Sequence, residues 1–110
     1  MDRRAVALAE ARGPRDGVTR HAGLVEDLLL SLRPAAAIIV NPPRGGLGEE
    51  VTNRLTALPS RRLVYVSCDP ATLGRDIARL STAYRVRDLR SFDLFPQTAH
   101  VETVARLEAP

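Results

Sequence analysis

The chain has 110 residues, of which 45% are hydrophobic and 26% are charged, so it holds one small domain of ordinary soluble globular composition. No apolar run approaches the roughly 20 residues of a membrane span, and the N-terminus lacks the apolar stretch and cleavage site of a secretory signal, so we expect a cytoplasmic protein with no membrane partner. The net charge is +3, and all the basic side chains other than histidine are arginines, which favours mild attraction to phosphate backbones. The single cysteine excludes an internal disulfide or a thiolate metal site.

The first third of the chain is expected to be mostly helical. Residues 3–12 have helical composition and are followed by glycine and proline breakers in residues 13–17. A short strand is expected over residues 18–21. A second, packed amphipathic helix is predicted from an apolar stripe that Pro34 ends. That stripe consists of Leu24, Val25, Leu28, Leu29 and Leu32.

Two strands alternate with two helices in the middle of the chain. Residues 35–40 form a continuous apolar run, as in a central parallel strand buried on both faces, and residues 62–68 form a second buried strand. A helical stripe follows each strand. The stripes are Leu47, Val51, Leu55 and Leu58, then Leu73, Ile77, Leu80 and Tyr84. This βαβα order predicts an α/β fold with a parallel sheet and right-handed crossovers.

The tail departs from that alternation. Residues 85–95 and 100–108 both have extended character and are separated by only four residues, which predicts a terminal antiparallel pair. No repeat or interdomain linker appears, so residues 1–110 are expected to form a single unit.

Polar residues gather where the predicted strands end. Ligands of open α/β sheets bind outside the carboxyl ends of the strands. Asn41-Pro42-Pro43-Arg44-Gly45-Gly46 follows the first strand, Ser67-Cys68-Asp69-Pro70 follows the second, and Gln97, His100 and Glu102 surround the last turn. The sequence therefore predicts a candidate site with a thiol, a carboxylate and a rigid polar loop.

Each of these residues also has a purely structural interpretation. Cys68 can be a small packed residue, since cysteine is among the most buried residue types. Asp69-Pro70 is typical of a helix N-cap with proline at the first helical position. The same helix N-terminus would favour a thiolate at Cys68. His100 and Glu102 can be surface residues, and the paired prolines can form a plain turn.

Three segments together carry a family resemblance. The segments "NPPRGGL", "YVSCDPATLGRD" and "FDLFPQTAHVETVARL" occur in this order and spacing. They resemble the catalytic half of the RNA 5-methyluridine (uracil-5-) methyltransferases, S-adenosylmethionine-dependent enzymes that modify uridines in transfer and ribosomal RNA. The resemblance implies S-adenosyl-L-methionine as cofactor, RNA as partner, and the C-terminal half of a Rossmann-like class I methyltransferase sheet.

The resemblance also implies roles for individual residues. Cys68 is the nucleophile that adds to carbon 6 of uracil and so makes carbon 5 nucleophilic. Glu102 is the base that removes the proton from carbon 5, after which the thiolate leaves. Asn41 lies at the cofactor, and the matching substrate-binding positions are Arg44, Gln97 and His100. The uridine must leave the RNA stack to reach the thiol.

Two departures from the family pattern leave other functions open. Asn41 stands where the family has aspartate, so it lacks the charge that would complement a sulfonium. Asn-Pro-Pro is also similar to the loop of amino-methyltransferases, which receives an exocyclic amine, although those enzymes usually follow the prolines with an aromatic residue where this chain has Arg44. A catalytically inactive remnant that binds RNA or another partner, and an unrelated α/β domain in which Cys68 is only packing, are the further alternatives.

The second departure is at the N-terminus. The glycine-rich cofactor loop and the acidic residue that follow the first two strands of the methyltransferase fold are absent, so we expect the C-terminal portion of a longer enzyme. A missing neighbour would expose the edge of the strand over residues 36–40, which predicts a homodimer or aggregation through that edge.

Overall fold

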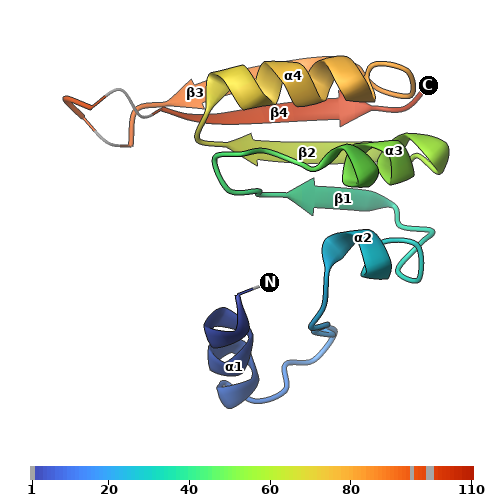
Figure 1. Cartoon of the computed structure of the whole chain (residues 1–110), viewed down its shortest axis with the longest axis vertical. Coiled ribbons are helices and arrows are strands. Elements are labelled where there is room, and N and C mark those ends of the chain that lie inside the picture. Colours follow the sequence, from blue (N-terminus) through green and yellow to red (C-terminus); the bar gives the residue numbers. More distant parts are fainter. Residues whose placement is uncertain (1, 95, 99–100) are drawn as a thin grey trace.

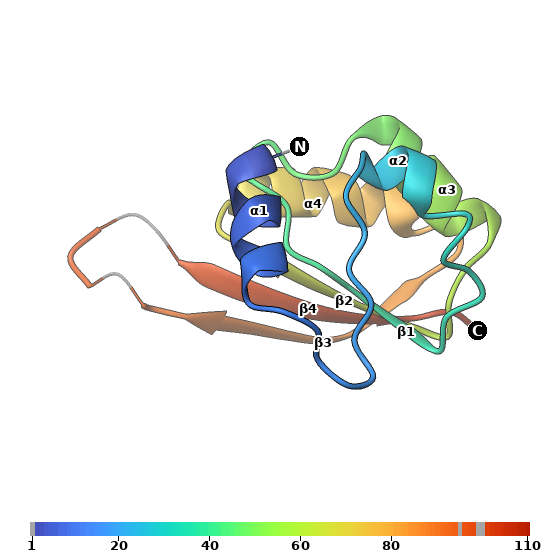
Figure 2. The ribbon, with the colours of Figure 1, turned by 90° about the horizontal axis from the view of Figure 1, so that it is seen from below.

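The computed structural model describes residues 2–94, 96–98 and 101–110, and its centre is a sheet with the strand order β1-β2-β4-β3. The strands are β1 (Ala37–Val40), β2 (Arg62–Ser67), β3 (Arg85–Phe92) and β4 (Glu102–Glu108). The helices are α1 (Arg3–Ala11), α2 (Val25–Leu28), α3 (Glu49–Ala57) and α4 (Pro70–Leu80). α3 and α4 lie over the sheet in Figure 1, and Figure 2 shows the helices on the same side of it.

The sheet is mixed, as the sequence predicts. β1 pairs in parallel with β2, with α3 in the connection between them. β3 and β4 form the predicted antiparallel pair. β4 also pairs antiparallel with β2, from Arg62 opposite Glu108 to Ser67 opposite Thr103. The last strand of the chain is therefore an inner strand, which joins the parallel part of the sheet to its antiparallel part.

The core lies between the sheet and the two helices α3 and α4. Its most deeply buried side chains come from the alternate positions of β2 and β4 and from the apolar stripes of the helices. They are Leu55, Leu63, Tyr65, Leu80, Tyr84, Ala105 and Leu107. Burial of a leucine side chain contributes roughly 1.5–3 kcal/mol, so the two predicted stripes in this part of the chain stabilise the packing of their helices.

The N-terminal expectations were partly wrong. Residues 18–21 do not form a strand, because only an isolated bridge between Arg15 and Val18 is present. The leucine stripe of the second predicted helix is helical only over α2, four residues long. Its outer members Leu24 and Leu32 remain 48% and 47% exposed. A short helix without a buried face has little to stabilise it, and this explains why periodicity alone predicted too long a helix.

The prediction that β1 is buried on both faces was also wrong. Within the described residues β1 pairs only with β2, so it forms an edge of the sheet. Ile38 and Val40 pack against the core, whereas Ile39 points the other way and is 73% exposed. The continuous apolar run therefore has one covered face and one open face.

Candidate active site at the carboxyl ends of β1 and β2

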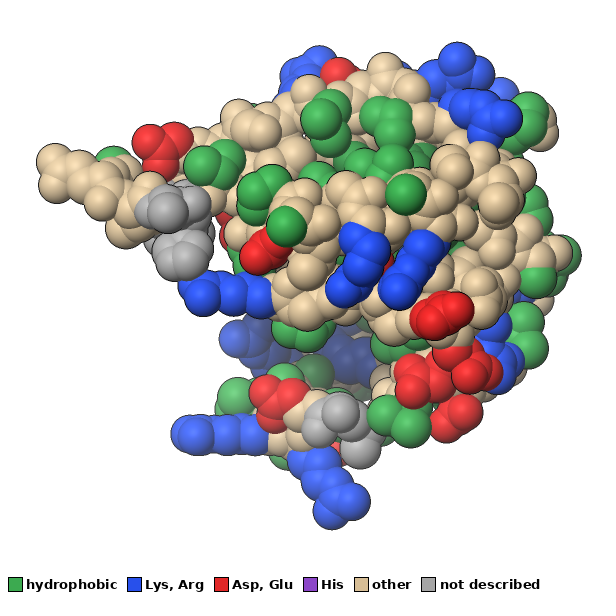
Figure 3. All heavy atoms as spheres, turned by 45° about the horizontal axis from the view of Figure 1, so that its top comes forward, with side chains coloured by type: hydrophobic (Ala, Val, Ile, Leu, Met, Phe, Trp, Pro, Cys, Tyr) green, Lys and Arg blue, Asp and Glu red, His purple; other side chains and the backbone are tan. Residues whose placement is uncertain are grey.

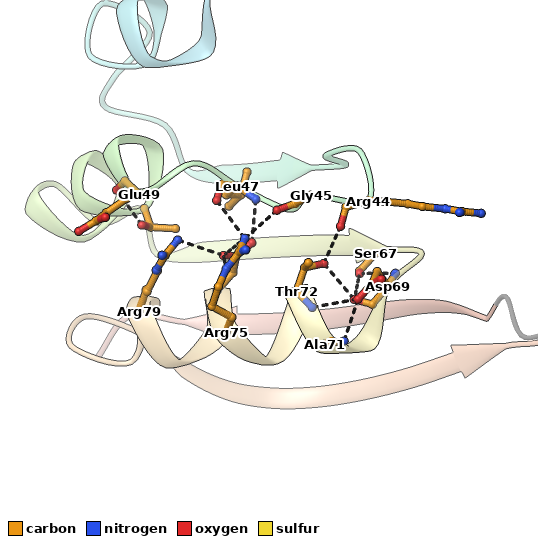
Figure 4. A network of polar contacts seen from close by, with 12 residues as sticks. Arg44, Gly45, Leu47, Glu49, Ser67, Asp69, Ala71, Thr72, Arg75 and Arg79 are labelled. Atoms are coloured by element: carbon orange, nitrogen blue, oxygen red, sulfur yellow. Dashed lines mark hydrogen bonds and ion pairs between the residues drawn. The ribbon is translucent and has the colours of Figure 1, made fainter.

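The loop that follows β1, residues 41–46, is a rigid turn. Its paired prolines fix the backbone dihedral φ at two positions, and the Gly46 N–H donates to the Pro43 carbonyl at 2.9 Å. Gly46 has φ of +75°, which favours glycine. Asn41 and Arg44 are exposed, and in Figure 4 the Arg44 side chain points away from the polar contacts around it. The loop therefore presents two polar side chains on a constrained backbone.

Side chains of α4 bind the backbone of this loop (Figure 4). The Thr72 hydroxyl donates to the Arg44 carbonyl at 3.0 Å. Arg75 Nη2 donates to the carbonyls of Gly45 at 2.7 Å and Leu47 at 3.3 Å. These contacts join segments that lie 28 to 30 residues apart in the chain, so α4 fixes the position of the loop.

The carboxylate of Asp76 lies at the centre of these contacts and is fully buried. Its Oδ2 accepts the Leu47 N–H at 2.7 Å and the Tyr65 hydroxyl at 2.6 Å. Its Oδ1 accepts two N–H groups of Arg75 at 3.0 and 2.9 Å, and Arg79 Nη1 lies 3.7 Å away. A buried carboxylate is tolerated only when it is paired and hydrogen-bonded, and this one has both kinds of partner.

Tyr65 shows the electrostatic effect of this environment. Burial, and next the hydrogen bond to Asp76, raise the pKa of the Tyr65 hydroxyl well above its ordinary value. The phenol therefore stays protonated and continues to donate to the carboxylate over the whole physiological pH range.

The sequence interpretation assigned no role to Thr72, Arg75 or Asp76, although all three lie within the quoted segment "YVSCDPATLGRD". One signal was available. Asp76 falls between Leu73 and Leu80 on the buried stripe of α4, where a charged residue is rare unless it has a partner. A carboxylate at a core position of an amphipathic helix thus indicates a buried polar contact.

Cys68 lies in the turn between β2 and α4. Its thiol is free and half-buried. The neighbouring turn is held by the Ser67 hydroxyl, which donates to the Asp69 carbonyl at 2.8 Å and accepts the Asp69 N–H at 3.0 Å. Asp69 forms the predicted N-cap, because its side chain accepts the backbone N–H groups of Ala71 and Thr72. The N-terminus of α4 therefore begins two residues after the thiol.

Asp69 is ionised in this cap. The hydrogen bond from the Thr72 N–H is the largest cause that lowers the pKa of the Asp69 carboxyl below its usual value, and the N–H of Ala71 and the charge of Arg44 act in the same direction. Arg44 is thus close enough to the end of β2 for its charge to act there.

Glu102 begins β4 and is half-buried. The last pair between β2 and β4 is Ser67 opposite Thr103. Cys68 follows the last residue of β2, and Glu102 is the first residue of β4, one position before Thr103. The thiol and the carboxylate therefore belong to the same end of the β2–β4 pair.

The other two predicted site residues belong to the connection between β3 and β4. Its described residues 96–98 lie beyond the ends of β3 and β4 (Figures 1 and 2). Gln97 lies in it, exposed and with φ of +65°, while His100 lies outside the described residues. The structure therefore brings Asn41, Arg44, Cys68 and Glu102 to one end of the sheet, and Gln97 is carried by the connection between β3 and β4.

A hollow of about 450 Å³ opens beside Asn41, between β1, α2 and α3. Its walls are mostly apolar, and Asn41 and Glu26 supply the polar side chains. A concave, mostly apolar surface with a few polar groups is typical of small-molecule sites. In the described ranges no cluster of His, Cys, Asp and Glu side chains could hold a metal ion, and no helix is long and apolar enough to cross a membrane.

Comparison with known protein families and sequences gives a consistent result. The family model for tRNA (uracil-5-)-methyltransferase matches residues 16–109. An uncharacterized RNA methyltransferase of Streptomyces coelicolor is 47% identical over 96 residues, which cover 84% of this chain and 21% of the relative. Another from Listeria innocua is 44% identical over 98 residues, with the same coverage. The chain spans about a fifth of the length of these relatives.

Solved structures are similar as well. The crystal structure of Pyrococcus abyssi tRNA (uracil-54, C5)-methyltransferase in complex with S-adenosyl-L-homocysteine superposes with a TM-score of 0.65 and 41% identity, covering 69% of this chain and 19% of that chain. The structure of an M1.HpyAVI–SAM complex gives a TM-score of 0.53 at 16% identity, covering 77% of this chain and 49% of that chain. The second likeness concerns the fold alone, and it agrees with a partial class I methyltransferase fold.

Proposed function

Since the chain belongs to the tRNA (uracil-5-)-methyltransferase family, we propose that residues 1–110 serve as a C-terminal portion of the catalytic domain of an enzyme that methylates carbon 5 of uridine in tRNA or rRNA. The observation that supports this proposal is the register of β2 and β4, which ends at Ser67 opposite Thr103, so that Cys68, which follows Ser67, and Glu102, which precedes Thr103, lie at the same end of the sheet. A thiol and a carboxylate are the two groups that methylation of a uracil ring at carbon 5 requires.

Cys68 acts as the nucleophile. Carbon 5 of uracil is a weak nucleophile, so the ring must first be activated. The Cys68 thiolate adds to carbon 6, a bond between sulfur and carbon forms, and the electron pair of the 5,6 double bond moves into an enolate that is nucleophilic at carbon 5. The Cys68 thiol is free and half-buried in the turn just before α4, at the end of the sheet where the polar loop after β1 also lies, and this position supports the role.

Glu102 acts as the base that completes the reaction. Once carbon 5 carries the methyl group, its remaining proton is removed by the Glu102 carboxylate. The electron pair of that C–H bond restores the 5,6 double bond, and the bond from carbon 6 to Cys68 breaks, so the thiolate is regenerated. Because Glu102 is in a paired strand, its backbone is held while the substrate changes.

S-adenosylmethionine supplies a methyl group on a positively charged sulfur. Among the described residues, Asn41 and the hollow beside it fit one part of this cofactor. Asn41 offers an amide to hydrogen-bond the cofactor but no charge to complement the sulfonium. Arg44, from the same loop, and Gln97 and His100 are proposed to contact the RNA. The arginines exposed in Figure 3 are spread over the visible face among acidic side chains and are not gathered in one patch.

The test is covalent capture of RNA. The longest natural form of the protein that contains these residues is incubated with S-adenosylmethionine and tRNA or rRNA transcripts in which fluorine replaces the hydrogen at carbon 5 of uridine. No proton can then be removed, and we expect a protein–RNA adduct that persists in denaturing gels. Cys68→Ala should abolish both the adduct and methyl transfer to ordinary RNA, whereas Glu102→Gln should allow adduct formation with ordinary uridine and slow its resolution.

Other outcomes would favour the alternative functions. Methyl transfer that persists in Cys68→Ala would contradict the uridine mechanism, and methyl transfer to an exocyclic amine that requires Asn41 would favour the amino-methyltransferase mechanism. RNA binding without any calorimetric binding of S-adenosylmethionine would favour an inactive remnant. If Asn41 limits cofactor affinity through its missing charge, Asn41→Asp should tighten that binding by about tenfold.

We also propose that the 110-residue chain forms a homodimer through β1. This strand is an edge with an exposed Ile39, and unpaired strand edges are prone to pair with another chain. Light scattering at increasing concentration should show a dimer, and Ile39→Lys should shift it to the monomer. A stable monomer at high concentration would contradict the proposal.

A further inference from the structure

We propose that Thr72, Arg75 and Asp76 form a positioning clamp, here called the α4 clamp, that fixes the loop at residues 41–46 relative to Cys68. The inference rests on the proposed function, because it explains how the loop and the Cys68 thiol keep the same relative position during methyl transfer. The three residues are positioning residues, since each acts on the loop backbone and none is proposed to touch the reacting atoms.

The first argument is the set of contacts. Thr72, Arg75 and Asp76 are spaced so that they share one side of α4, and between them they bind four backbone groups at three residues of the loop and its exit, namely Arg44, Gly45 and Leu47. The Thr72 hydroxyl donates to the carbonyl of Arg44, and Arg75 donates to the carbonyl of Gly45. Asp76 accepts the N–H of Leu47 and Arg75 donates to the carbonyl of that residue.

The second argument is the absence of free space at Gly46. A Cβ atom at Gly46 would lie 2.5 Å from Asp76 Oδ2 and 2.7 Å from Arg75 Nη2. Gly46 also has a positive φ that other residues rarely adopt. The preceding Gly45 differs in both respects, because a Cβ there would meet no atom within 4 Å and its φ is not positive. The close approach of loop and helix is therefore specific to one glycine.

The third argument is the connection to the thiol. α4 begins at Pro70, directly after the Asp69 cap, and Thr72 donates its hydroxyl to the Asp69 carbonyl at 3.3 Å as well as to Arg44. Asp76 is joined in turn to β2 through the Tyr65 hydroxyl. The clamp thus holds the loop to both the strand before Cys68 and the helix after it, so the loop and the thiol form one rigid unit.

The experiment measures this relation directly. Because Cys68 is the only cysteine, a nitroxide spin label can be attached there in the 110-residue chain, and the broadening that it causes in the amide signals of residues 45–47 reports how the loop lies relative to position 68. Gly46→Ala should weaken this broadening and accelerate hydrogen exchange of the Leu47 amide by about tenfold, the effect of losing one hydrogen bond. Gly45→Ala, the matched control, should leave both unchanged.

A second pair of variants applies if Gly46→Ala does not fold. Thr72→Val removes the hydroxyl at nearly constant shape and should weaken the broadening at residue 45, while Thr72→Ser keeps the hydroxyl and should restore it. Amide signals of β2 and β4 serve as the folding control. Unchanged broadening in folded Gly46→Ala or in Thr72→Val would overturn the clamp. This readout needs no methyl transfer, so it is independent of the Cys68→Ala result that tests the proposed function.

Discussion

The first 46 residues and the rest of the chain have similar apolar content but different packing. No described residue before Leu47 is buried, whereas the ten buried hydrophobic side chains lie between Leu47 and Leu107. Both regions contain leucines at helical spacing. The difference shows that periodicity specifies which face of a helix is apolar, and that only a sheet in contact with that face turns the pattern into a buried core.

The two regions also hold their helices by different means. α1 has an N-cap, since the Asp2 side chain accepts the N–H groups of Arg4 and Ala5, but none of its residues is buried. α4 has the Asp69 cap and in addition buries Leu73, Asp76 and Leu80. A cap satisfies the helix terminus, while burial determines whether the helix contributes to the stability of the whole chain.

The largest expected difference between the regions comes from shortening a leucine. Leu55→Ala removes a side chain that is 0% exposed and should lower the free energy of unfolding by about 2–5 kcal/mol, because it leaves a cavity between α3 and the sheet. Leu8→Ala, at a leucine 62% exposed, should change it by less than about 0.5 kcal/mol. Urea unfolding followed by circular dichroism measures both free energies of unfolding. Equal losses in the two variants would contradict the conclusion that only the region after Leu47 forms the core.

Alkaline pH should destabilise the buried region by a smaller amount. Burial is the main cause that raises the pKa values of Tyr65 and Tyr84 above their ordinary value. The unfolded chain loses these protons near pH 10, whereas the folded chain keeps them, so the stability they contribute is complete below pH 10 and is lost as the pH rises above it. At pH 11 we expect a loss of about 1 kcal/mol from Tyr65 and less from Tyr84.

The chain suits this measurement because it has no lysine, and arginine stays protonated to about pH 12. Urea unfolding at pH 9 and pH 11 gives the change, and Tyr65→Phe, which has no titrating proton, should reduce it. A free energy of unfolding that is the same at both pH values would show that the tyrosines titrate alike in the folded and unfolded chain.

The smallest effect is expected at the cap of α1. Asp2→Ala removes the acceptor for two helix amides and should accelerate hydrogen exchange in α1, because those N–H groups lose their partner. The midpoint of global unfolding should stay the same, since α1 buries no residue. A shift of that midpoint would show that the N-terminal helix and the core unfold together.

The fold could be predicted where pattern and packing agree. The order of strands and helices from β1 onward follows from apolar periodicity, and the antiparallel tail follows from two extended runs with a short connection. The errors lie at positions whose neighbours are not specified by local sequence. Ile39 belongs to an apolar run, but its exposure depends on whether another element covers that face of β1, and Leu24 and Leu32 depend on a packing partner in the same way.

The candidate site divides in a similar manner. The sequence predicted Cys68, Glu102 and the loop after β1 as parts of one site, because each ends or begins a strand and each matches the family resemblance; the structure brings them to one end of the sheet, and their roles stay predictions. It did not identify the contacts of Asp76, because a hydrogen bond to Leu47, 29 residues away, has no signature in local spacing. His100 stays a prediction, since it lies outside the described residues.

The close approach of Gly46 to Asp76 also constrains how the sequence can evolve. A side chain at position 46 collides with the carboxylate at position 76, and loss of that carboxylate leaves the Tyr65 hydroxyl and the Leu47 N–H without an acceptor. Neither position can change alone without cost, so a lineage would have to substitute them together or leave both unchanged. Aligned family sequences should therefore show positions 46 and 76 either unchanged together or substituted together.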